Sequence, residues 1–379
     1  MRAVALIDGE HVPEVVRDAL AELPYEWVGA VLVGGTEKLR GRVDYGVPLR
    51  TDFGDAELVV DLSDEPVLGP GERFRWASRA LAAGLPYVGA DFRFDPPRFH
   101  DAGVPAIGVV GAGKRVGKTA VAAHLAVLAA RDRDVVIVAM GRGGPPEPEL
   151  VERPPAVEEL VELSRSGRHA ASDHLELAVV TGLPTVGCRR AGGGLAGRVF
   201  VSNVLEGARL AAARGPDLLV VDSSGTAIPP VAVDRRVLVV GPGHSLDAHL
   251  DTYRRLVSDL VVSVGAELPG AVPARIRLRP LEPLDGRVAV FTAGPAALDG
   301  LEADVVHVSH HLGDRLALAG ELERVEADTY LVELKGAAID LVAEDALARG
   351  RRVVLAADDL EGDGLDEALL ALIPETARV

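Results

Sequence analysis

The chain has 379 residues, of which 48% are hydrophobic, and a formal net charge of −17. This length and apolar content exclude a disordered chain and indicate a globular protein of two or three domains. The negative charge disfavours nucleic acid and anionic membranes as general partners. The single cysteine, Cys188, excludes a disulfide framework. With no signal-peptide pattern and no apolar run of about 20 residues, we expect a cytoplasmic protein without a membrane span.

The first hundred residues alternate between apolar runs and helical patterns, which predicts a small parallel α/β domain. The predicted strands lie at 1–8, 26–35, 57–64 and 85–92, and the predicted helices at 11–23 and 71–84. Three prolines between 92 and 105 predict a linker. We therefore predict an N-terminal α/β substrate-binding domain over residues 1–100.

A second alternating series begins after the linker and predicts a larger α/β domain over 101–379, with 285–379 as its closing C-terminal part. Its Val- and Leu-rich runs are typical of a mostly parallel sheet covered by helices on both faces. The predicted strands are 106–113, 134–144, 217–225, 235–243, 287–294, 304–311, 329–336 and 351–359. Helices are predicted at 118–132, 156–164 and 203–214.

The stretch VGAGKRVGKTA, residues 110–120, combines a buried strand, a Gly-rich turn and Gly-Lys-Thr before a helix, which is the context of a phosphate-binding P-loop. Five residues separate Gly111 from Gly117, which resembles the loop of dethiobiotin synthetase-type proteins. Only four lysines occur beside 36 arginines, and two of them lie here. The predicted nucleotide-binding residues are Gly111, Gly113, Lys114, Arg115, Val116, Gly117, Lys118, Thr119, Ala120 and, from a later strand end, Gly225.

The strand 217–225 supplies a carboxylate, Asp222, at its end. We predict that Asp222 and the Thr119 hydroxyl hold Mg²⁺, and that Lys114, Lys118, Arg142 and Asp222 act in catalysis. The Asn-Lys-x-Asp guanine reader is excluded because the sole asparagine, Asn203, precedes Val204. ATP is therefore favoured over GTP.

Further polar residues follow other predicted strands, where ligands of open α/β sheets gather. A cationic, Gly-rich surface beside the P-loop would suit an acceptor with several negative charges. Solvated arginines, a plain helix cap and a core histidine are the alternatives. The candidate residues of this surface are Arg142, Gly143, Gly144, His174, Arg189, Arg190, Ser202 and Asn203.

The motifs ALIDGEH, VGAGKRVGKTA, VAMGRGGPPEPEL, ASDH, PTVGCRRAGGGLAG, SNVLEGA and SSGTAIPPV resemble, in this order, those of the cyclic 2,3-diphosphoglycerate synthetase family. The match covers most of residues 1–235 and continues more loosely through 331–342. The resemblance implies a P-loop ligase that uses ATP and Mg²⁺ to cyclise 2,3-bisphosphoglycerate, with release of ADP and phosphate. K⁺ is a further candidate cofactor, and a homodimer a candidate assembly.

The same resemblance implies substrate contacts outside the P-loop. In the N-terminal domain the candidates are Asp8, Glu10, His11 and Lys38. Asp8 and Glu10 would hold a metal or orient His11, and the alternative is a capped strand end before a solvated helix start. Near the C-terminus, Lys335 is assigned to charge neutralisation.

Three other functions remain open. One is an ATP-dependent synthetase or kinase for a different phosphorylated or carboxylated acid. The others are a nucleotide-switch ATPase that binds a protein partner and a non-catalytic nucleotide sensor.

Overall fold

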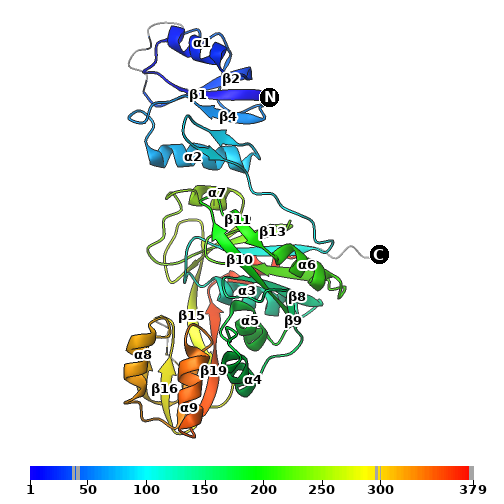
Figure 1. The fold of residues 1–379 in the computed structure, drawn as a ribbon, viewed down its shortest axis with the longest axis vertical. Coiled ribbons are helices and arrows are strands. Elements are labelled where there is room, and N and C mark those ends of the chain that lie inside the picture. The colour runs from blue at the N-terminus through cyan, green and yellow to red at the C-terminus, as the bar shows by residue number, and fades with distance from the viewer. Residues whose placement is uncertain (36–38, 40–42, 295–297, 299, 375–379) are drawn as a thin grey trace. The chain divides into compact units, whose positions relative to one another are not determined.

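The computed structural model describes residues 1–35, 39, 43–294, 298 and 300–374 (Figure 1). The chain forms two compact units. Unit 1 comprises residues 1–98 and 245–257, and unit 2 comprises residues 99–244 and 258–379. Within the described residues, no helix is long and apolar enough to cross a bilayer.

Unit 1 is a six-stranded sheet in the order β3-β2-β1-β4-β5-β6, parallel except for the last pair. Its strands are β1 Arg2–Asp8, β2 Glu26–Val33, β3 Leu49–Arg50, β4 Leu58–Asp61, β5 Tyr87–Val88 and β6 Arg93–Phe94. Its helices are α1 Pro13–Glu22, α2 Pro70–Ala82 and α7 Asp251–Leu256. Because β2 and β4 flank β1, the strand order reverses between β1 and β4, at the position where such sheets bind ligands.

The segment 245–257 was assigned from sequence to the second domain, but in the structure it groups with unit 1. Its helix α7 packs against α2, and Phe74 of α2 meets His249 edge-on with ring centroids 6.0 Å apart.

Unit 2 contains one large sheet in the order β11-β10-β8-β12-β7-β13-β14-β15-β19-β18-β16-β17, with β9 beside β10. The first group of strands is β7 Ala106–Gly111, β8 Val135–Gly141, β9 Glu149–Val151, β10 Thr185–Gly193, β11 Val199–Ser202, β12 Leu218–Asp222, β13 Arg235–Val240, β14 Leu260–Val264 and β15 Val272–Pro280. The C-terminal group is β16 Arg287–Phe291, β17 Asp304–Ser309, β18 Thr329–Glu333 and β19 Arg352–Glu361. An antiparallel β15–β19 pair joins the two groups.

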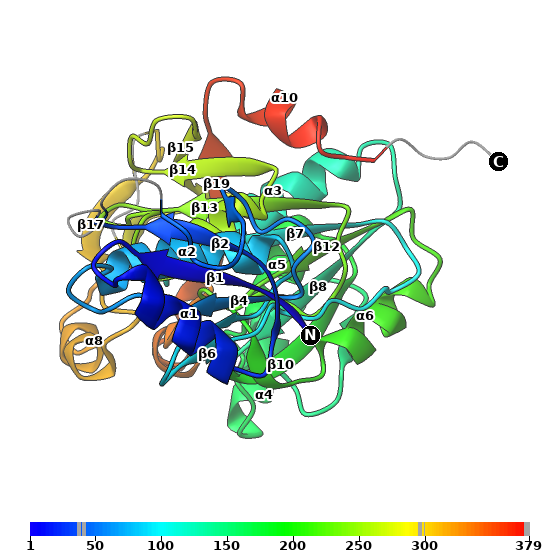
Figure 2. The ribbon, with the colours of Figure 1, turned by 90° about the horizontal axis from the view of Figure 1, so that it is seen from above.

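Helices cover both faces of this sheet (Figure 2). The helices are α3 Lys118–Ala129, α4 Val157–Arg165, α5 Asp173–Thr181, α6 Val204–Ala212, α8 Arg315–Leu322, the π-helical turn η1 Ala338–Ala343, α9 Glu344–Ala348 and α10 Leu365–Leu370. Alternate residues of β8 divide the core. Val135, Ile137 and Ala139 pack with α3, whereas the intervening residues pack with α6. The predicted fold class is confirmed.

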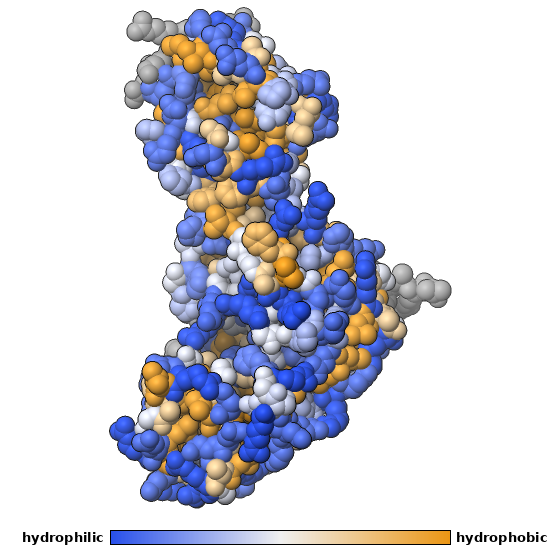
Figure 3. Space-filling view, in the orientation of Figure 1, coloured by the Kyte–Doolittle hydropathy of each residue, from blue (hydrophilic) through white to orange (hydrophobic). Residues whose placement is uncertain are grey.

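The sequence did not predict β14 or β15. These strands place two more parallel neighbours beyond β13, and β15 then turns the sheet toward the C-terminal group through its antiparallel partner. Charged residues at 275, 277 and 279 alternate with apolar ones, since one face of β15 is exposed. On the face drawn in Figure 3, hydrophilic residues predominate and apolar patches lie between them.

Candidate active site

The P-loop connects β7 to α3, and its backbone conformation matches the predicted phosphate cradle. Arg115 and Gly117 both have left-handed φ angles, 61° and 84°. A Cβ on Gly117 would lie 2.9 Å from the side chain of Val264, so only glycine fits this turn without displacement. Helix α3 begins directly after it at Lys118. The N-terminal amides of α3 therefore point toward the loop, where they favour an anion.

Lys118 and Asp222 form a buried ion pair at the end of this loop. The Lys118 ammonium donates to both carboxylate oxygens, at 3.0 and 3.2 Å. Burial raises the pKa of Asp222 to about 6 in spite of the neighbouring ammonium. This carboxylate is the partner that compensates the charge of the lysine.

Two arginines from neighbouring strand ends converge beside Gly225, which follows β12. A Cβ on Gly225 would lie 3.6 Å from Nη2 of Arg190 and 3.8 Å from Nη2 of Arg142. Gly225 itself is close to the P-loop, since a Cβ on Gly111 would lie 3.0 Å from its carbonyl oxygen. The two guanidinium groups therefore lie next to the phosphate cradle, as the sequence predicted for Arg142.

Arg190 retains unused hydrogen-bonding capacity. Its Nη2 donates to the Ser224 carbonyl at 2.8 Å, but its buried Nε has no partner among the residues described. Burial lowers the pKa of Arg190, and the charge of Arg142 lowers it further. A buried donor without an acceptor, beside a second cation, is the chemistry of an anion site.

The two consecutive arginines do not act as a pair. Successive side chains of a strand point to opposite faces, so when Arg190 faces Gly225, Arg189 points the other way and is exposed. The backbone N–H of Arg189 instead donates to Asn203 at 2.7 Å. The predicted joint role of Arg189 and Arg190 is therefore not supported by the geometry.

Ser202 and Asn203 have structural partners at the start of α6. The Ser202 hydroxyl accepts from the N–H of Val204, and the Asn203 amide donates to the carbonyls of Pro145 and Pro146 at 3.3 and 3.1 Å. These contacts fasten the loop after β8 to β10 and α6. This arrangement favours a structural role over substrate binding, but Asn203, the N-cap residue of α6, makes no side-chain cap hydrogen bond.

His174 is buried, with only 4% of its surface exposed. It packs against Gly187 of β10, and its Nδ1 lies 3.1 Å from the Ser172 hydroxyl. Burial lowers its pKa to about 4, so it stays neutral at physiological pH. The predicted substrate contact of His174 is not supported, because the side chain belongs to the core between α5 and β10.

Two residues that precede His174, namely His169 and Asp173, lie against the glycines on either side of Arg142. A Cβ on Gly143 would lie 2.5 Å from Cδ2 of His169, and one on Gly141 would lie 3.5 Å from Oδ2 of Asp173. The sequence points to Asp173 only as part of the motif ASDH, beside His174, and it does not point to His169. The only available signal was their position within the same Gly- and Ser-containing segment, 164–173.

A further histidine, His244, was not predicted either. It follows β13, and its Nε2 occupies the position that a Cβ on Gly113 would take. Its Nδ1 lies 3.1 Å from the Pro242 carbonyl. His244 thus lines the P-loop on the β13 side, and the arginines line it on the β12 side.

Lys335 is not a free cation. Its ammonium contacts Glu333, Asp358 at 2.6 Å and Glu176 at 3.4 Å. Burial alone would lower its pKa, but the three carboxylates raise it well above the ordinary value. The cluster fastens β18 and β19 to α5, and Glu176 and Asp358 share a small cavity with Thr119. This geometry favours a structural role over the predicted neutralisation of substrate charge.

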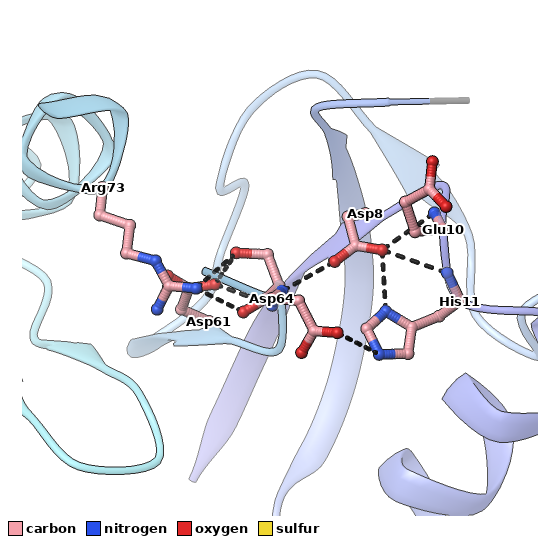
Figure 4. A network of polar contacts seen from close by, with 7 residues as sticks. Asp8, Glu10, His11, Asp61, Asp64 and Arg73 are labelled. Carbon is pink, nitrogen blue, oxygen red and sulfur yellow. Dashed lines mark hydrogen bonds and ion pairs between the residues drawn. The ribbon is translucent and has the colours of Figure 1, made fainter. Parts of the chain in front are cut away.

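Unit 1 contains a separate polar network at the ends of β1 and β4 (Figure 4). Asp8 is fully buried and accepts from the N–H groups of Glu10, His11 and Asp64 at 3.0, 3.2 and 2.8 Å. Its Oδ1 also lies 2.8 Å from Nδ1 of His11, which therefore carries the proton. Burial raises the pKa of Asp8, but these hydrogen bonds outweigh that effect and lower it overall.

The same network continues along β4. Tyr87 donates to Asp61 at 2.6 Å, and Arg73 donates to the Ser63 carbonyl at 2.6 Å. Both oxygens of Asp8 are already used, which favours the orienting role for Asp8 over metal binding. Lys38, the other candidate from this domain, lies outside the described residues.

A magnesium ion fits the donors at the P-loop. The Thr119 hydroxyl and the Asp222 carboxylate are hard oxygen ligands, and Mg²⁺ takes few protein ligands when phosphates supply the others. Among the residues described, no group of three His, Cys, Asp or Glu side chains forms a metal cage. Such a magnesium site would therefore be completed by the nucleotide.

The site is that of a P-loop nucleotide-binding protein. It combines a strand, a left-handed glycine turn, a helix that begins with Lys-Thr, and a carboxylate on the adjacent strand. Three family profiles for cyclic 2,3-diphosphoglycerate synthetase match in order: the N-terminal domain at 2–95, the P-loop domain at 106–278 and the C-terminal domain at 289–359. The chain belongs to this family. The family resemblance seen in the sequence is thus confirmed.

Individual relatives support this assignment over the full length. A protein of Rubrobacter xylanophilus named cyclic 2,3-diphosphoglycerate synthetase is 44% identical, over 100% of this chain and 98% of its own. Proteins of the same name from Thermococcus gammatolerans and Pyrococcus horikoshii are 38% and 37% identical, over 97% and 99% of this chain and 96% of each relative.

Proposed function

We propose that this protein uses ATP to cyclise 2,3-bisphosphoglycerate, forming an intramolecular phosphoanhydride and releasing ADP and phosphate. Its relatives carry the name of this activity. The observation that carries the proposal is the pair Arg142 and Arg190 beside Gly225, with the unpartnered Nε of Arg190 next to the P-loop. A nucleotide switch has no need of this second anion site.

Charge neutralisation is the main task of such a site. At a separation of about 4 Å and an effective dielectric of about 20, each pair of like charges costs on the order of 4 kcal/mol. In the proposed reaction Lys118 and the α3 amides hold the nucleotide phosphates, with Lys114 as a second loop cation. Arg142 and Arg190 hold the acceptor phosphates, and Asp222 releases Lys118 when the nucleotide binds.

The reaction proceeds in two displacements. One phosphate of the acceptor attacks the γ-phosphorus of ATP, and ADP leaves. The other acceptor phosphate then attacks the phosphorus of the first, the ring closes, and the transferred group departs as phosphate. Catalysis rests on positioning and on stabilisation of charge, as in other phosphoryl transfers.

The proposal also includes a magnesium ion and the N-terminal domain. Thr119 and Asp222 would hold Mg²⁺, which supplies further charge neutralisation at the phosphates, and K⁺ is a second candidate cation. Residues 1–100 form the proposed substrate-binding domain, where His11 is the side chain that Asp8 holds in position. A cytoplasmic location is supported by the single, buried Cys188, and a homodimer is the proposed assembly.

Phosphorus NMR tests the proposal directly. The purified protein with ATP, Mg²⁺ and 2,3-bisphosphoglycerate should convert two monoester resonances into the coupled pair of a cyclic pyrophosphate. A panel of other phosphorylated and carboxylated acids is run in parallel. If another acid stimulates ADP release while 2,3-bisphosphoglycerate gives no ring with or without K⁺, the assigned substrate is wrong.

A further inference from the structure

The proposed cyclisation consumes a proton. The mechanism therefore needs a proton donor, which the residues assigned to the reaction so far do not supply. Fully ionised ATP and bisphosphoglycerate carry nine negative charges together. The cyclic product, ADP and hydrogen phosphate carry eight, so one proton must be taken up. It is needed when the ring closes, because the departing group would otherwise leave as the phosphate trianion. The reaction therefore calls for an acid beside the acceptor phosphates.

The segment between α4 and α5 places an imidazole against the loop that carries Arg142. His169 packs on Gly143, one residue after Arg142, with its Cδ2 2.5 Å from where a Cβ would lie. Asp173, at the other end of the segment, packs on Gly141. The segment thus lies along the loop that carries Arg142, and His169 remains exposed toward solvent.

The other two histidines near the site are less suited to this task. His174 is buried and its pKa is lowered to about 4, so it carries no proton to donate at neutral pH. His244 lies against Gly113, on the β13 side of the P-loop and away from the arginines. Imidazole is the side chain that gains and loses a proton near neutral pH.

We propose that His169 is the general acid of ring closure. Its imidazolium gives a proton to the bridging oxygen of the departing phosphoryl group as that P–O bond breaks and the new P–O bond of the ring forms. The neutral imidazole then takes up a proton from water before the next turnover. This assignment rests on the proposed function, because another acceptor would need a different proton balance.

The charged groups around His169 come from three elements. Arg142 lies in the loop after β8, and Arg190 faces the same site from β10. On its own segment, Arg168 is paired with Glu149, and Asp173 supplies a negative charge. A bound acceptor would add further negative charge beside these groups.

The test compares His169→Gln with His100→Gln, a matched change at an exposed histidine outside the site. Glutamine keeps much of the size and polarity of the ring but cannot transfer a proton. We expect His169→Gln to lower kcat about 100-fold and to remove the loss of kcat at high pH that general-acid catalysis predicts for wild type. Because the first displacement needs no acid, ADP should form in excess of cyclic product and the linear intermediate should accumulate. His100→Gln should behave as wild type.

A second variant separates chemistry from folding. His169→Ala, with a melting temperature near that of wild type, should recover part of its activity when imidazole is added. The inference is overturned if wild type makes the cyclic product and His169→Gln keeps its kcat and pH profile, or if His244→Gln abolishes the alkaline fall instead. If wild type makes no cyclic product at all, the proposed function fails and this assignment falls with it.

Discussion

The polar groups at the strand ends of the two units differ in how much hydrogen-bonding capacity they leave unused. In unit 1, Asp8 accepts from three backbone N–H groups and from His11, so both of its oxygens are satisfied. In unit 2, Arg190 has a buried Nε without a partner among the described residues, and Arg142 lies beside it. The comparison teaches that burial and charge alone do not identify a binding site. In unit 2 an unmet donor lies beside a second cation and the P-loop, and this combination marks the site.

This difference has an electrostatic counterpart. Hydrogen bonds lower the pKa of Asp8 in spite of burial, so its carboxylate is stabilised as a structural group. Burial raises the pKa of Asp222 to about 6, so its ionised form is held at a cost in free energy. Because the ionised form of Asp222 is held at a cost, the Lys118–Asp222 ion pair is suited to a site where a phosphate replaces the carboxylate as the partner of the lysine.

The largest effect should come from the P-loop lysine. Lys118→Met should lower kcat about 1,000-fold, because it removes a donor to the charge that develops in phosphoryl transfer. Lys118→Arg should not restore activity, since a planar fork does not replace a compact ammonium in the loop. Steady-state assays of ADP release measure both. Near-normal turnover by Lys118→Met would remove the P-loop from the mechanism.

The arginine neighbours sharpen the comparison within one strand. Arg190→Met should reduce kcat/KM for the acceptor about 100-fold, through loss of a charged hydrogen bond to phosphate. Arg189→Met should reduce it less than about threefold, because its side chain lies on the exposed face. The two variants lose the same charge, so the ratio of their kcat/KM values reports the position of the side chain alone. Equal losses would contradict the assignment of faces.

In unit 1, Asp8→Asn should weaken folding rather than chemistry. The amide cannot accept all four hydrogen bonds, which should cost about 1–3 kcal/mol of unfolding free energy. Both tryptophans, Trp27 and Trp76, lie in unit 1, so urea unfolding followed by their fluorescence reports this unit. The control is Asp18→Asn, since Asp18 lies on α1 of the same unit and is exposed.

The pH dependence of the Asp8 effect follows from its lowered pKa. The stabilisation by Asp8 is present above its ordinary pKa of 3.8 and is lost as the pH falls through the lower native value. The difference in unfolding free energy between wild type and Asp8→Asn should therefore shrink in acid. A difference that stays constant down to low pH would show that the carboxylate is not the stabilising form.

The smallest effect concerns Glu176 in the Lys335 cluster. Burial raises its pKa to about 8, so its contribution to stability is complete below the ordinary value of 4.5 and is lost as the pH rises through about 8. The melting temperature of Glu176→Gln should therefore change less between pH 5 and 9 than that of wild type. Its value relative to wild type should rise as the pH becomes alkaline. Parallel curves for the two proteins would contradict the raised pKa.

Much of the fold and the P-loop could be predicted because both depend on local patterns. Apolar runs mark the parallel strands, and the spacing of Gly117, Lys118 and Thr119 fixes the helix start. Arg142 was found because it directly follows a strand. These signals involve neighbours in sequence, so no tertiary contact was needed to read them.

The remaining features depend on contacts between distant segments. The register of β10 against β8 decides which of Arg189 and Arg190 faces the site. This register cannot be predicted from the sequence. His169 meets Gly143 across 26 positions, and Lys335 gathers carboxylates from α5, β18 and β19. The contacts therefore favour structural roles for Lys335 and His174, and they draw attention to His169.

The central claim is that Arg142 and Arg190 form the site for the acceptor phosphates, and calorimetric titration tests it most directly. 2,3-Bisphosphoglycerate is titrated into wild type and into Arg142→Met, each saturated with ADP and Mg²⁺. We predict a Kd at least about 10-fold weaker for the variant, with ADP affinity unchanged. Equal acceptor affinity in the two proteins would contradict the account.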